Sequence, residues 1–180
     1  DGRTDLTKYT SGCSTLENLV VYPHGSAARR PGSTFIAEVA NSANKTRLIP
    51  FEFSTTQTYM LEFSNLKMRA YKDSGAVLEG DKTITAITKA NPAVVTSNSH
   101  GYSNGDEVVI TAVGGMTEVN GKRFLVADKT TNTFELQDKD GVDINSSSFT
   151  TYTSGGVSNK VFELTTPYTT AQLFDLKFAQ

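Results

Sequence analysis

Cysteine and tryptophan are almost missing from this chain of 180 residues, which has one Cys and no Trp. The single cysteine, Cys13, has no partner for an internal disulfide, and a Cys-based zinc site needs several thiolates. Neither kind of cross-link is therefore expected to stabilise the fold. The chain is long enough for one large domain or two small ones, and the burial of apolar side chains has to hold it together.

An excess of charge of one sign is missing as well. The chain has 17 basic and 19 acidic residues, a net charge of -2, and no stripe of Lys or Arg. Neutralising many phosphates requires such a basic surface, so no sequence-specific nucleic-acid binding is expected. No apolar run approaches the ~18 residues of a membrane-spanning helix, and no signal-peptide pattern follows Asp1, so no membrane-spanning segment is expected.

What the chain has in quantity is Ser, Thr and Gly, a composition typical of strands and turns. Short β-type runs with turn signals between them fill its first part. Tyr59, Leu61 and Phe63 stand at every second position of one run, which places them on the same face of a strand. Pro50 has no N–H to donate, which predicts an edge strand or a bulge. The strands expected here cover residues 34–39, 47–53, 58–63, 67–71 and 76–78, and a short helix is expected over 6–11.

The amino-acid composition of the chain changes near Gly80. From there the chain is dense in Thr, Asn, Ser and Gly, and Arg123 is the one arginine up to residue 161. We interpret residues 81–164 as a small β-barrel-like domain inserted into a base domain formed by residues 1–80 and 165–180. The whole chain is thus predicted to be all-β, with an antiparallel base sheet or sandwich. The strands expected in the insertion cover residues 83–89, 93–96, 107–112, 123–127, 133–136 and 156–164.

Turn signals and apolar side chains predict a separate core for the insertion. Asn-Gly between β-type runs is the strongest short hairpin signal, because both central residues of a type I′ turn need positive φ. Asp81 and Leu164, near its two ends, are expected to lie close together so that the chain re-enters one base sheet. Turns are expected at residues 104–106, 114–115, 120–121 and 140–141, and at 73–75 in the base. The expected core side chains are Ile84, Ile87, Val94, Val108, Ile110, Phe124, Val126, Phe134 and Leu136.

The last segment of the chain contains Pro167, and a short helical turn capped by Thr169 or Thr170 is expected after it. The apolar run over residues 173–178 is typical of a strand. Because the chain stops inside this run, we expect it to be a fragment of a longer protein.

The ionisable residues form no pattern of a known catalytic site. His24 and His100 each precede a glycine, where an imidazole usually closes a backbone hydrogen bond, and Cys13 has no neighbouring His or second Cys. The acidic run from Asp138 to Asp143 resembles a calcium loop, but the loop's glycine and glutamate positions do not match, so an exposed acidic turn is favoured. A carboxylate pair for glycoside hydrolysis stays open, since any two acids can meet in space. No catalytic residue, cofactor or metal ligand is predicted, and the protein is expected not to be an enzyme.

Two arginines beside a turn signal form the candidate interaction site. Pro31 presets φ for the first central position of a type II turn, and Gly32 supplies the positive φ of the second. Arg29 and Arg30 then stand at the entrance of the turn. A solvated surface turn is one interpretation; the other is a subunit or partner contact, since Arg pairs with carboxylates and is enriched at interfaces. The predicted interface residues are Arg29, Arg30, Pro31 and Gly32.

Several segments of the chain resemble the N-terminal region of tail proteins of short-tailed bacteriophages, above all the nozzle or tail tubular type. These segments are residues 5–9, 11–13, 16–21, 23–25, 29–35, 47–53, 59–63 and 173–180. The resemblance implies a virion protein that forms rings around a DNA channel and contacts other tail proteins, such as the adaptor and the fibres. The insertion departs from the simplest nozzle pattern, which leaves a tail hub or a fibre-attachment protein open.

The insertion is itself similar to a small β domain that recurs in phage tail proteins and is related to the first catalytic cysteine half-domain of ubiquitin-activating enzymes. The similar segments are residues 91–96, 100–102, 105–108, 115–121, 124 and 131–136. This similarity implies no ubiquitin chemistry, because Cys13 lies outside the insertion. The expected function is a structural component of a phage tail, nozzle or hub, located in the virion and assembled as a homo-oligomeric ring. The alternative is a tail adhesin whose insertion binds glycan on the host cell surface.

Overall fold

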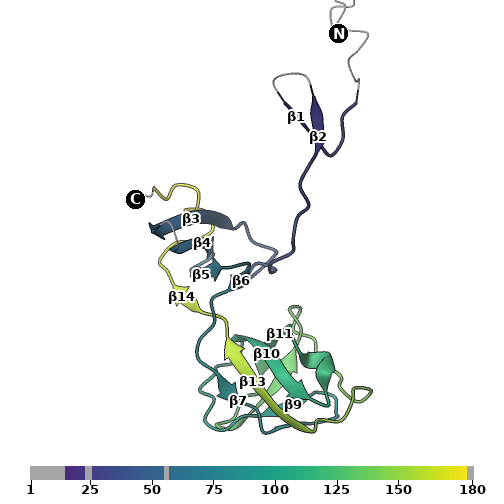
Figure 1. Cartoon of the computed structure of the whole chain (residues 1–180). Helices are drawn as coiled ribbons and strands as arrows, with labels where there is room; N and C mark the ends of the chain where they lie inside the picture. Colours follow the sequence, from purple (N-terminus) through teal and green to yellow (C-terminus); the bar gives the residue numbers. More distant parts are fainter. Residues whose placement is uncertain (1–14, 23–25, 55–56, 178–180) are drawn as a thin grey trace, which may run out of the picture. The chain divides into compact units, whose positions relative to one another are not determined.

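The computed structural model describes residues 15–22, 26–54 and 57–177. They belong to two compact units, residues 1–35 and residues 36–180. Nearly all regular structure is antiparallel β-strand, which confirms the predicted fold class (Figure 1). No helix in the described part is long and apolar enough to cross a membrane. The helix expected over residues 6–11, Cys13 and His24 lie outside the described residues.

The first unit contains a hairpin of two short strands, β1 (Leu19–Val21) and β2 (Ala27–Arg29). They pair antiparallel, with Leu19 opposite Arg29 and Val21 opposite Ala27. Two backbone hydrogen bonds extend the ladder, from Tyr22 N to Ser26 O at 2.8 Å and from Arg30 N to Asn18 O at 3.0 Å. The second strand of this hairpin was not predicted, because Ala-Ala-Arg has little β-type character by itself.

The second unit contains the base sheet, whose strands are β3 (Arg47–Ser54), β4 (Gln57–Ser64), β5 (Lys67–Lys72), β6 (Gly75–Ala76) and β14 (Glu163–Thr165). The order is β14-β5-β4-β3, and β6 also pairs with β5. Pro50 lies on the edge strand β3, as its missing donor predicted.

The strand expected over residues 34–39 is wrong. Alternating apolar residues occur there, but no strand pairs with them, and Phe35 is 82% exposed.

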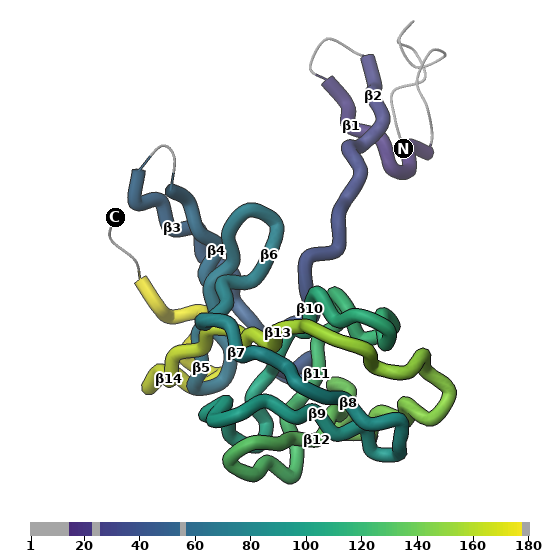
Figure 2. Tube along the Cα trace, turned by 60° about the horizontal axis from the view of Figure 1, so that its bottom comes forward, coloured from purple at the N-terminus to yellow at the C-terminus, as the bar shows by residue number. Residues whose placement is uncertain are grey.

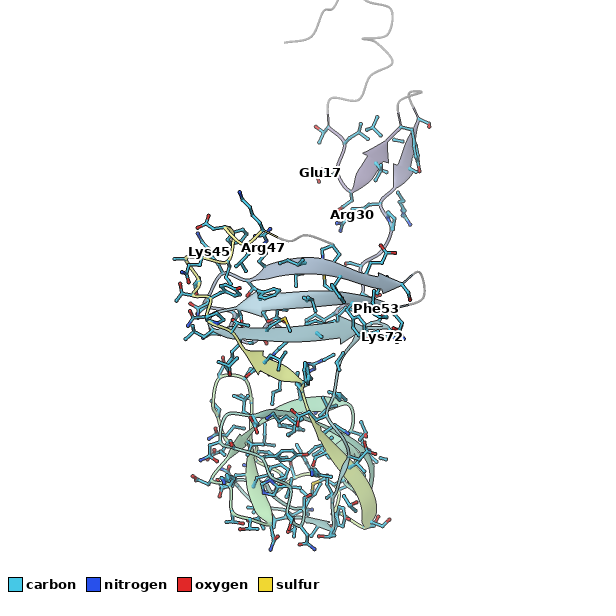
Figure 3. All side chains as sticks on the ribbon, turned by 90° about the vertical axis from the view of Figure 1, so that its left-hand side faces the viewer. Glu17, Arg30, Lys45, Arg47, Phe53 and Lys72 are labelled. Carbon is cyan, nitrogen blue, oxygen red and sulfur yellow. The ribbon has the colours of Figure 1, made fainter. Side chains whose placement is uncertain are left out.

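The two faces of the base sheet bury different side chains. The pairing puts Ile49, Leu61 and Phe63 on one face, where Leu173 packs on them and is fully buried. Arg47 holds this cover in place, because its Nη1 donates to the carbonyls of Leu173 (2.8 Å) and Leu176 (3.0 Å) (Figure 3). The strand expected over residues 173–178 is wrong for its described part, residues 173–177. Residues 170–175 form consecutive turns instead. The first turn is closed by a hydrogen bond from Gln172 N to the carbonyl of Thr169.

The second unit also contains a curled seven-stranded sheet, ordered β7-β13-β10-β11-β12-β9-β8. Its elements are β7 (Lys82–Thr83), β8 (Ala86–Ile87), β9 (Val94–Thr96), β10 (Glu107–Gly114), the 3-10 turn η1 (Thr117–Val119), β11 (Lys122–Ala127), β12 (Thr133–Gln137) and β13 (Ser154–Lys160).

The curled sheet encloses one hydrophobic core, and eight of the nine predicted core side chains belong to it. The exception is Val94. Val95 faces the core opposite Phe134, whereas Val94 pairs with Glu135 on the outer side. Three apolar residues in a row, from Ala93 to Val95, gave no alternation from which the inward face could be chosen.

The turn glycines have the expected backbone, but the turn types differ from the prediction. Gly105, Gly121 and Gly141 have positive φ. At Asn120-Gly121 only the glycine does, since Asn120 has φ -67° and ψ 134°, the geometry of a type II turn. Positive φ at both central residues, which a type I′ turn requires, occurs instead at Asp73 and Ser74 between β5 and β6.

The chain passes between the two sheets at adjacent points (Figure 2). Leu78 and Val161 form an isolated antiparallel bridge, flanked by hydrogen bonds from Glu79 N to Lys160 O (2.8 Å) and from Phe162 N to Val77 O (2.9 Å). The single strand predicted over residues 156–164 is wrong: β13 pairs in the curled sheet and β14 pairs with β5 in the base sheet. The division into a base domain and an inserted domain stays a prediction.

Candidate functional site

The β1–β2 hairpin has almost no buried side chain. Every described residue from 15 to 35 is exposed except Ala28, which is half-buried. A two-stranded hairpin by itself is marginally stable in water, and clustered exposed apolar side chains mark interaction surfaces. The hairpin is therefore a candidate interaction surface. The exposed apolar side chains of the hairpin and of the residues just before and after its first strand are Leu16, Leu19, Val20, Val21 and Tyr22. Phe35, at the end of the first unit, is exposed as well.

The four predicted interface residues lie at the end of this hairpin and just after it. Arg29 is the last residue of β2, and its side chain is exposed. The backbone N–H of Arg30 donates to the carbonyl of Asn18, and the Arg30 side chain is also exposed (Figure 3). The predicted type II turn is wrong, because the φ of Gly32 lies outside the left-handed region. Pairing with β1 keeps the backbone of Arg29 extended, and the φ of Pro31 also fits an extended chain.

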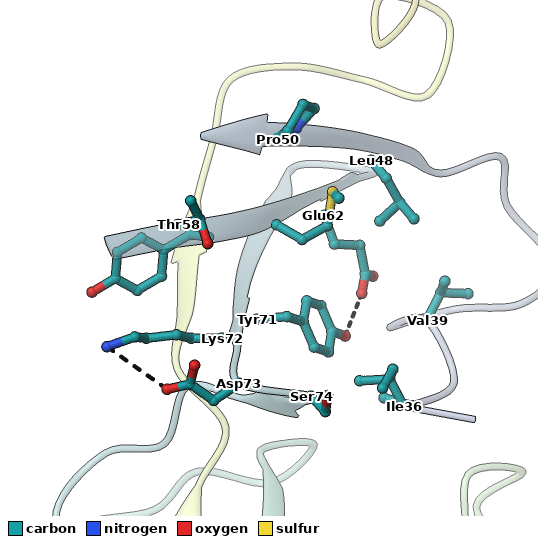
Figure 4. Close-up of a pocket in the computed structure, with 13 residues that line it drawn as sticks. Ile36, Val39, Leu48, Pro50, Thr58, Glu62, Tyr71, Lys72, Asp73 and Ser74 are labelled. Carbon is teal, nitrogen blue, oxygen red and sulfur yellow. Dashed lines mark hydrogen bonds and ion pairs between the residues drawn. The ribbon is translucent and has the colours of Figure 1, made fainter. Parts of the chain in front are cut away.

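The second unit carries a groove of about 480 Å³ on the face of the base sheet opposite Leu173 (Figure 4). The described segment 36–39 forms one wall, and strands β3 to β5 form the rest together with Asp73 and Ser74 of the turn after β5. Most of the lining side chains are apolar, and several of them are partly exposed to solvent. The apolar lining residues are Ile36, Ala37, Val39, Leu48, Pro50 and Met60.

Glu62 lies within this groove and is only 1% exposed. Its Oε2 accepts a short hydrogen bond of 2.5 Å from the Tyr71 hydroxyl, and its Oε1 accepts one of 3.0 Å from Ala40 N. Burial, together with the bond to the Glu62 carboxylate, raises the pKa of the Tyr71 phenol, so this phenol stays protonated and donates. Nothing local in the sequence indicates that the segment near Ala40 covers Glu62.

A second cluster of charges joins the base sheet to the curled sheet. Glu107, on β10, is buried, and its carboxylate receives Lys139 Nζ at 2.6 Å, Arg69 Nη1 at 2.7 Å and Arg123 Nη1 at 3.3 Å. Arg69, on β5, also holds Glu163 of β14 at 3.0 Å. One arginine of the base sheet thus connects a carboxylate of each sheet.

The pKa shifts in this cluster follow from burial and charge. Burial by itself would raise the pKa of Glu107, but Lys139, Arg69 and Arg123 outweigh it and lower that pKa. The pKa of Glu163 is also lowered, because Lys67 and Arg69 outweigh its burial. For Arg69, burial acts to lower the pKa, and the two carboxylates raise it above its usual value. All three groups are therefore charged at neutral pH.

Among the residues considered for chemistry, the described ones His100 and Asp138 have structural partners. His100 is buried, accepts a hydrogen bond from Tyr102 N at Nδ1 (3.0 Å) and lies 3.3 Å from Thr133 O at Nε2, which confirms its expected backbone role. Asp138 Oδ1 accepts hydrogen bonds from Asp140 N and Val142 N within its own turn. Within the described ranges, no cluster of three or more His, Cys, Asp or Glu residues could hold a metal ion.

The comparisons with known proteins concern the curled sheet. Residues 90–161 match the family model of the ubiquitin-activating enzyme E1 FCCH domain, which supports the similarity of the insertion to that small β domain. The match covers β9 to β13 and ends at Val161, where the chain passes to the base sheet. No curated protein matches the chain.

Proposed function

We propose that this chain is a non-enzymatic structural component of a bacteriophage tail, of the nozzle or hub kind, that assembles in the virion with copies of itself and with neighbouring tail proteins. The observation that carries the proposal is the β1–β2 hairpin, an arm whose described residues expose apolar side chains and include no fully buried one. The resemblance of residues 3–80 and 165–180 to phage tail proteins supports the same function.

The energetics favour assembly through this arm. Burying a Leu or Val side chain contributes about 1.5–3 kcal/mol. Leu16, Leu19, Val20 and Val21 of the arm are 41–59% exposed, so docking on another subunit gains part of such a contribution for each side chain that it covers. The exposed Arg29 and Arg30 add charged groups that select a partner surface carrying carboxylates.

The buried acids suit a structural protein better than an enzyme. The carboxylate of Glu107 is held by three cations, and that of Glu62 by two hydrogen bonds inside the fold. Groups bound in this way maintain the conformation of the chain and are not poised to exchange protons with a substrate.

The alternative, a glycan-binding module, has a polar hollow of about 290 Å³ beside the curled sheet as its candidate site. Sugar rings usually stack on exposed aromatic faces, but Tyr102 in this hollow is buried and its hydroxyl is bonded to Ser158 O at 2.9 Å. The hollow therefore offers no aromatic platform, and the assembly function is preferred.

The test is the association state of the full chain, measured by sedimentation velocity and negative-stain microscopy. The wild-type protein should form rings or discrete oligomers, and Leu19→Asp with Val21→Asp should remain folded but monomeric. The matched control is Val142→Asp, because Val142 is equally apolar and 60% exposed but lies outside the arm. A wild-type protein that stays monomeric and retains host-surface glycan would contradict the proposal.

A further inference from the structure

The base sheet and the curled sheet have separate hydrophobic cores. The cluster on the base sheet comprises Ile49, Phe63 and Leu173, and the cluster inside the curled sheet shares no residue with it. Among the described strands, pairing is likewise confined to one sheet or the other. Two units that are joined by polar groups, without a shared apolar core, are expected to move relative to each other.

Two chain crossings, residues 77–79 and 160–162, form a neck between the sheets. Val77 N donates to a carbonyl of β5 in the base sheet at 2.8 Å, and Val161 N donates to a carbonyl of β10 in the curled sheet at 2.8 Å. The first crossing is thus bonded to one sheet and the second crossing to the other. Because an isolated bridge holds the two crossings together, the neck is a local connection about which one sheet can turn against the other.

The Arg69 side chain crosses from the base sheet to the curled sheet beside this neck. Its Nη1 lies 2.7 Å from Glu107 Oε2, and its Nη2 lies 3.0 Å from Glu163 Oε2 within the base sheet. Arg69 also stands opposite Glu62 in the ladder, but both oxygens of that carboxylate accept hydrogen bonds from other groups. The contact of Arg69 with Glu107 therefore bears on the orientation of the two sheets.

Each carboxylate that Arg69 contacts has further cations on its own side of the neck. Glu107 is paired with Arg123 of β11 and with Lys139 of the turn after β12, both in the curled sheet. Glu163 is paired with Lys67 of β5 at 2.7 Å, in the base sheet. Breaking a buried ion pair is costly when it leaves a charge without a partner. Separation of Arg69 from Glu107 leaves neither of them unpaired.

We propose that Arg69 is the latch of a hinge between the two sheets. Its bond to Glu107 holds the curled sheet in one orientation on the base sheet, and release of this bond lets the curled sheet turn about the neck as an intact unit. The inference depends on the predicted division into a base domain and an inserted domain, and it is independent of the proposed function in a phage tail.

The experiment measures the distance between the two sheets in the full chain. In a background with Cys13→Ser, nitroxide labels are attached to Leu48→Cys on β3 and Lys122→Cys on β11, two exposed positions. Labelled chains are diluted into unlabelled chains, so that the recorded distances lie within one copy. Double electron–electron resonance should give a narrow distance distribution with Arg69 and one about twofold broader in Arg69→Met.

The matched control is Lys67→Met, because Lys67 also pairs with Glu163 but belongs to the same sheet. Its distance distribution should be as narrow as that of the parent chain. Hydrogen exchange should show that the amides of β10 to β12 stay protected in Arg69→Met, since the core of the curled sheet is unchanged.

Three results would overturn the latch. One is a folded Arg69→Met variant with the parent distribution, and another is a parent distribution that is already as broad as that of the variant. The third is loss of protection in both sheets together, because the curled sheet would then not be an intact unit. Arg69→Gln, which keeps a hydrogen-bonding amide, is the second variant should Arg69→Met not fold, and the same three results apply to it.

Discussion

Arg69 Nη1 lies 2.7 Å from Glu107 Oε2, and both side chains are almost fully buried. Arg69 belongs to β5 of the base sheet and Glu107 to β10 of the curled sheet, so the pair joins the two sheets. Beside it, Leu78 and Val161 bring the two chain crossings together. The pair therefore fixes the base sheet against the curled sheet, whose core is built from other residues.

Replacing Glu107 by Gln should destabilise the protein by about 3 kcal/mol, because it leaves Arg69, Lys139 and Arg123 close together without their shared carboxylate. Urea unfolding at pH 7 measures the loss. The control is Glu135→Gln on β12: burial and the nearby Asp128 and Asp143 raise the pKa of Glu135, so removing its charge should cost little or nothing. Equal losses in the two variants would argue against a special role for Glu107.

Acid should weaken the same cluster. The folded-state pKa values of Glu107 and Glu163 are lowered, so their contribution to stability is fully present above the unfolded pKa of about 4.3 and is lost as pH falls through the folded pKa values. The stability difference between wild type and Glu107→Gln should accordingly shrink between pH 5 and pH 2, to be followed by urea unfolding across ~pH 2–7. A difference that stays constant down to the lowest pH would show that Glu107 is not the titrating group.

Gly115→Ala should be far more destabilising than Gly121→Ala, although both glycines have positive φ. A Cβ at Gly115 would collide with the Thr151 carbonyl oxygen and lie 2.8 Å from Thr153 N, whereas nothing lies within 4 Å of a Cβ at Gly121. Gly121→Ala should cost about 1–2 kcal/mol of backbone strain, and Gly115→Ala about 1–3 kcal/mol more for overpacking. Thermal unfolding of both variants checks the ranking.

Leu173→Ala should cost about 2–5 kcal/mol, because Leu173 is fully buried on Ile49 and Phe63. Phe174→Ala, at the exposed neighbour, should cost less despite the larger side chain. Hydrogen exchange in Leu173→Ala also tests the proposed division into a base domain and an inserted domain. Amides of β3 to β5 should exchange faster, while those of β10 to β12 stay protected; a uniform loss of protection would indicate one cooperative unit.

The double change of Arg29 and Arg30 to Ala should weaken association by about 2 kcal/mol or more and leave the melting temperature unchanged. Both side chains are exposed, so the monomer loses no buried contact. Sedimentation velocity and thermal unfolding, carried out on one preparation, give the two readouts. Unfolding of the monomer with unchanged association would remove these residues from the proposed interface.

The sequence by itself determined the features that depend on local chemistry. Alternating apolar residues located β3, β4 and β10 to β12, because the two-residue period of a strand appears directly in the order of side chains. Pro50 indicated the sheet edge, and glycines at positions 105, 121 and 141 marked turns, since missing donors and positive φ belong to single residue types.

Only the tertiary structure decided which segments meet. The run over residues 156–164 carries no sign of the switch between sheets at Val161, because that switch depends on the distant partners β10 and β5. Glu62 is bonded to Ala40, 22 positions away, and to Tyr71 on the neighbouring strand. Glu107 is likewise a charged strand residue whose three cations lie 16 to 38 positions away. The groove on the base sheet and the charge cluster around Glu107 are therefore products of long-range packing, whose free energy no local sequence pattern encodes.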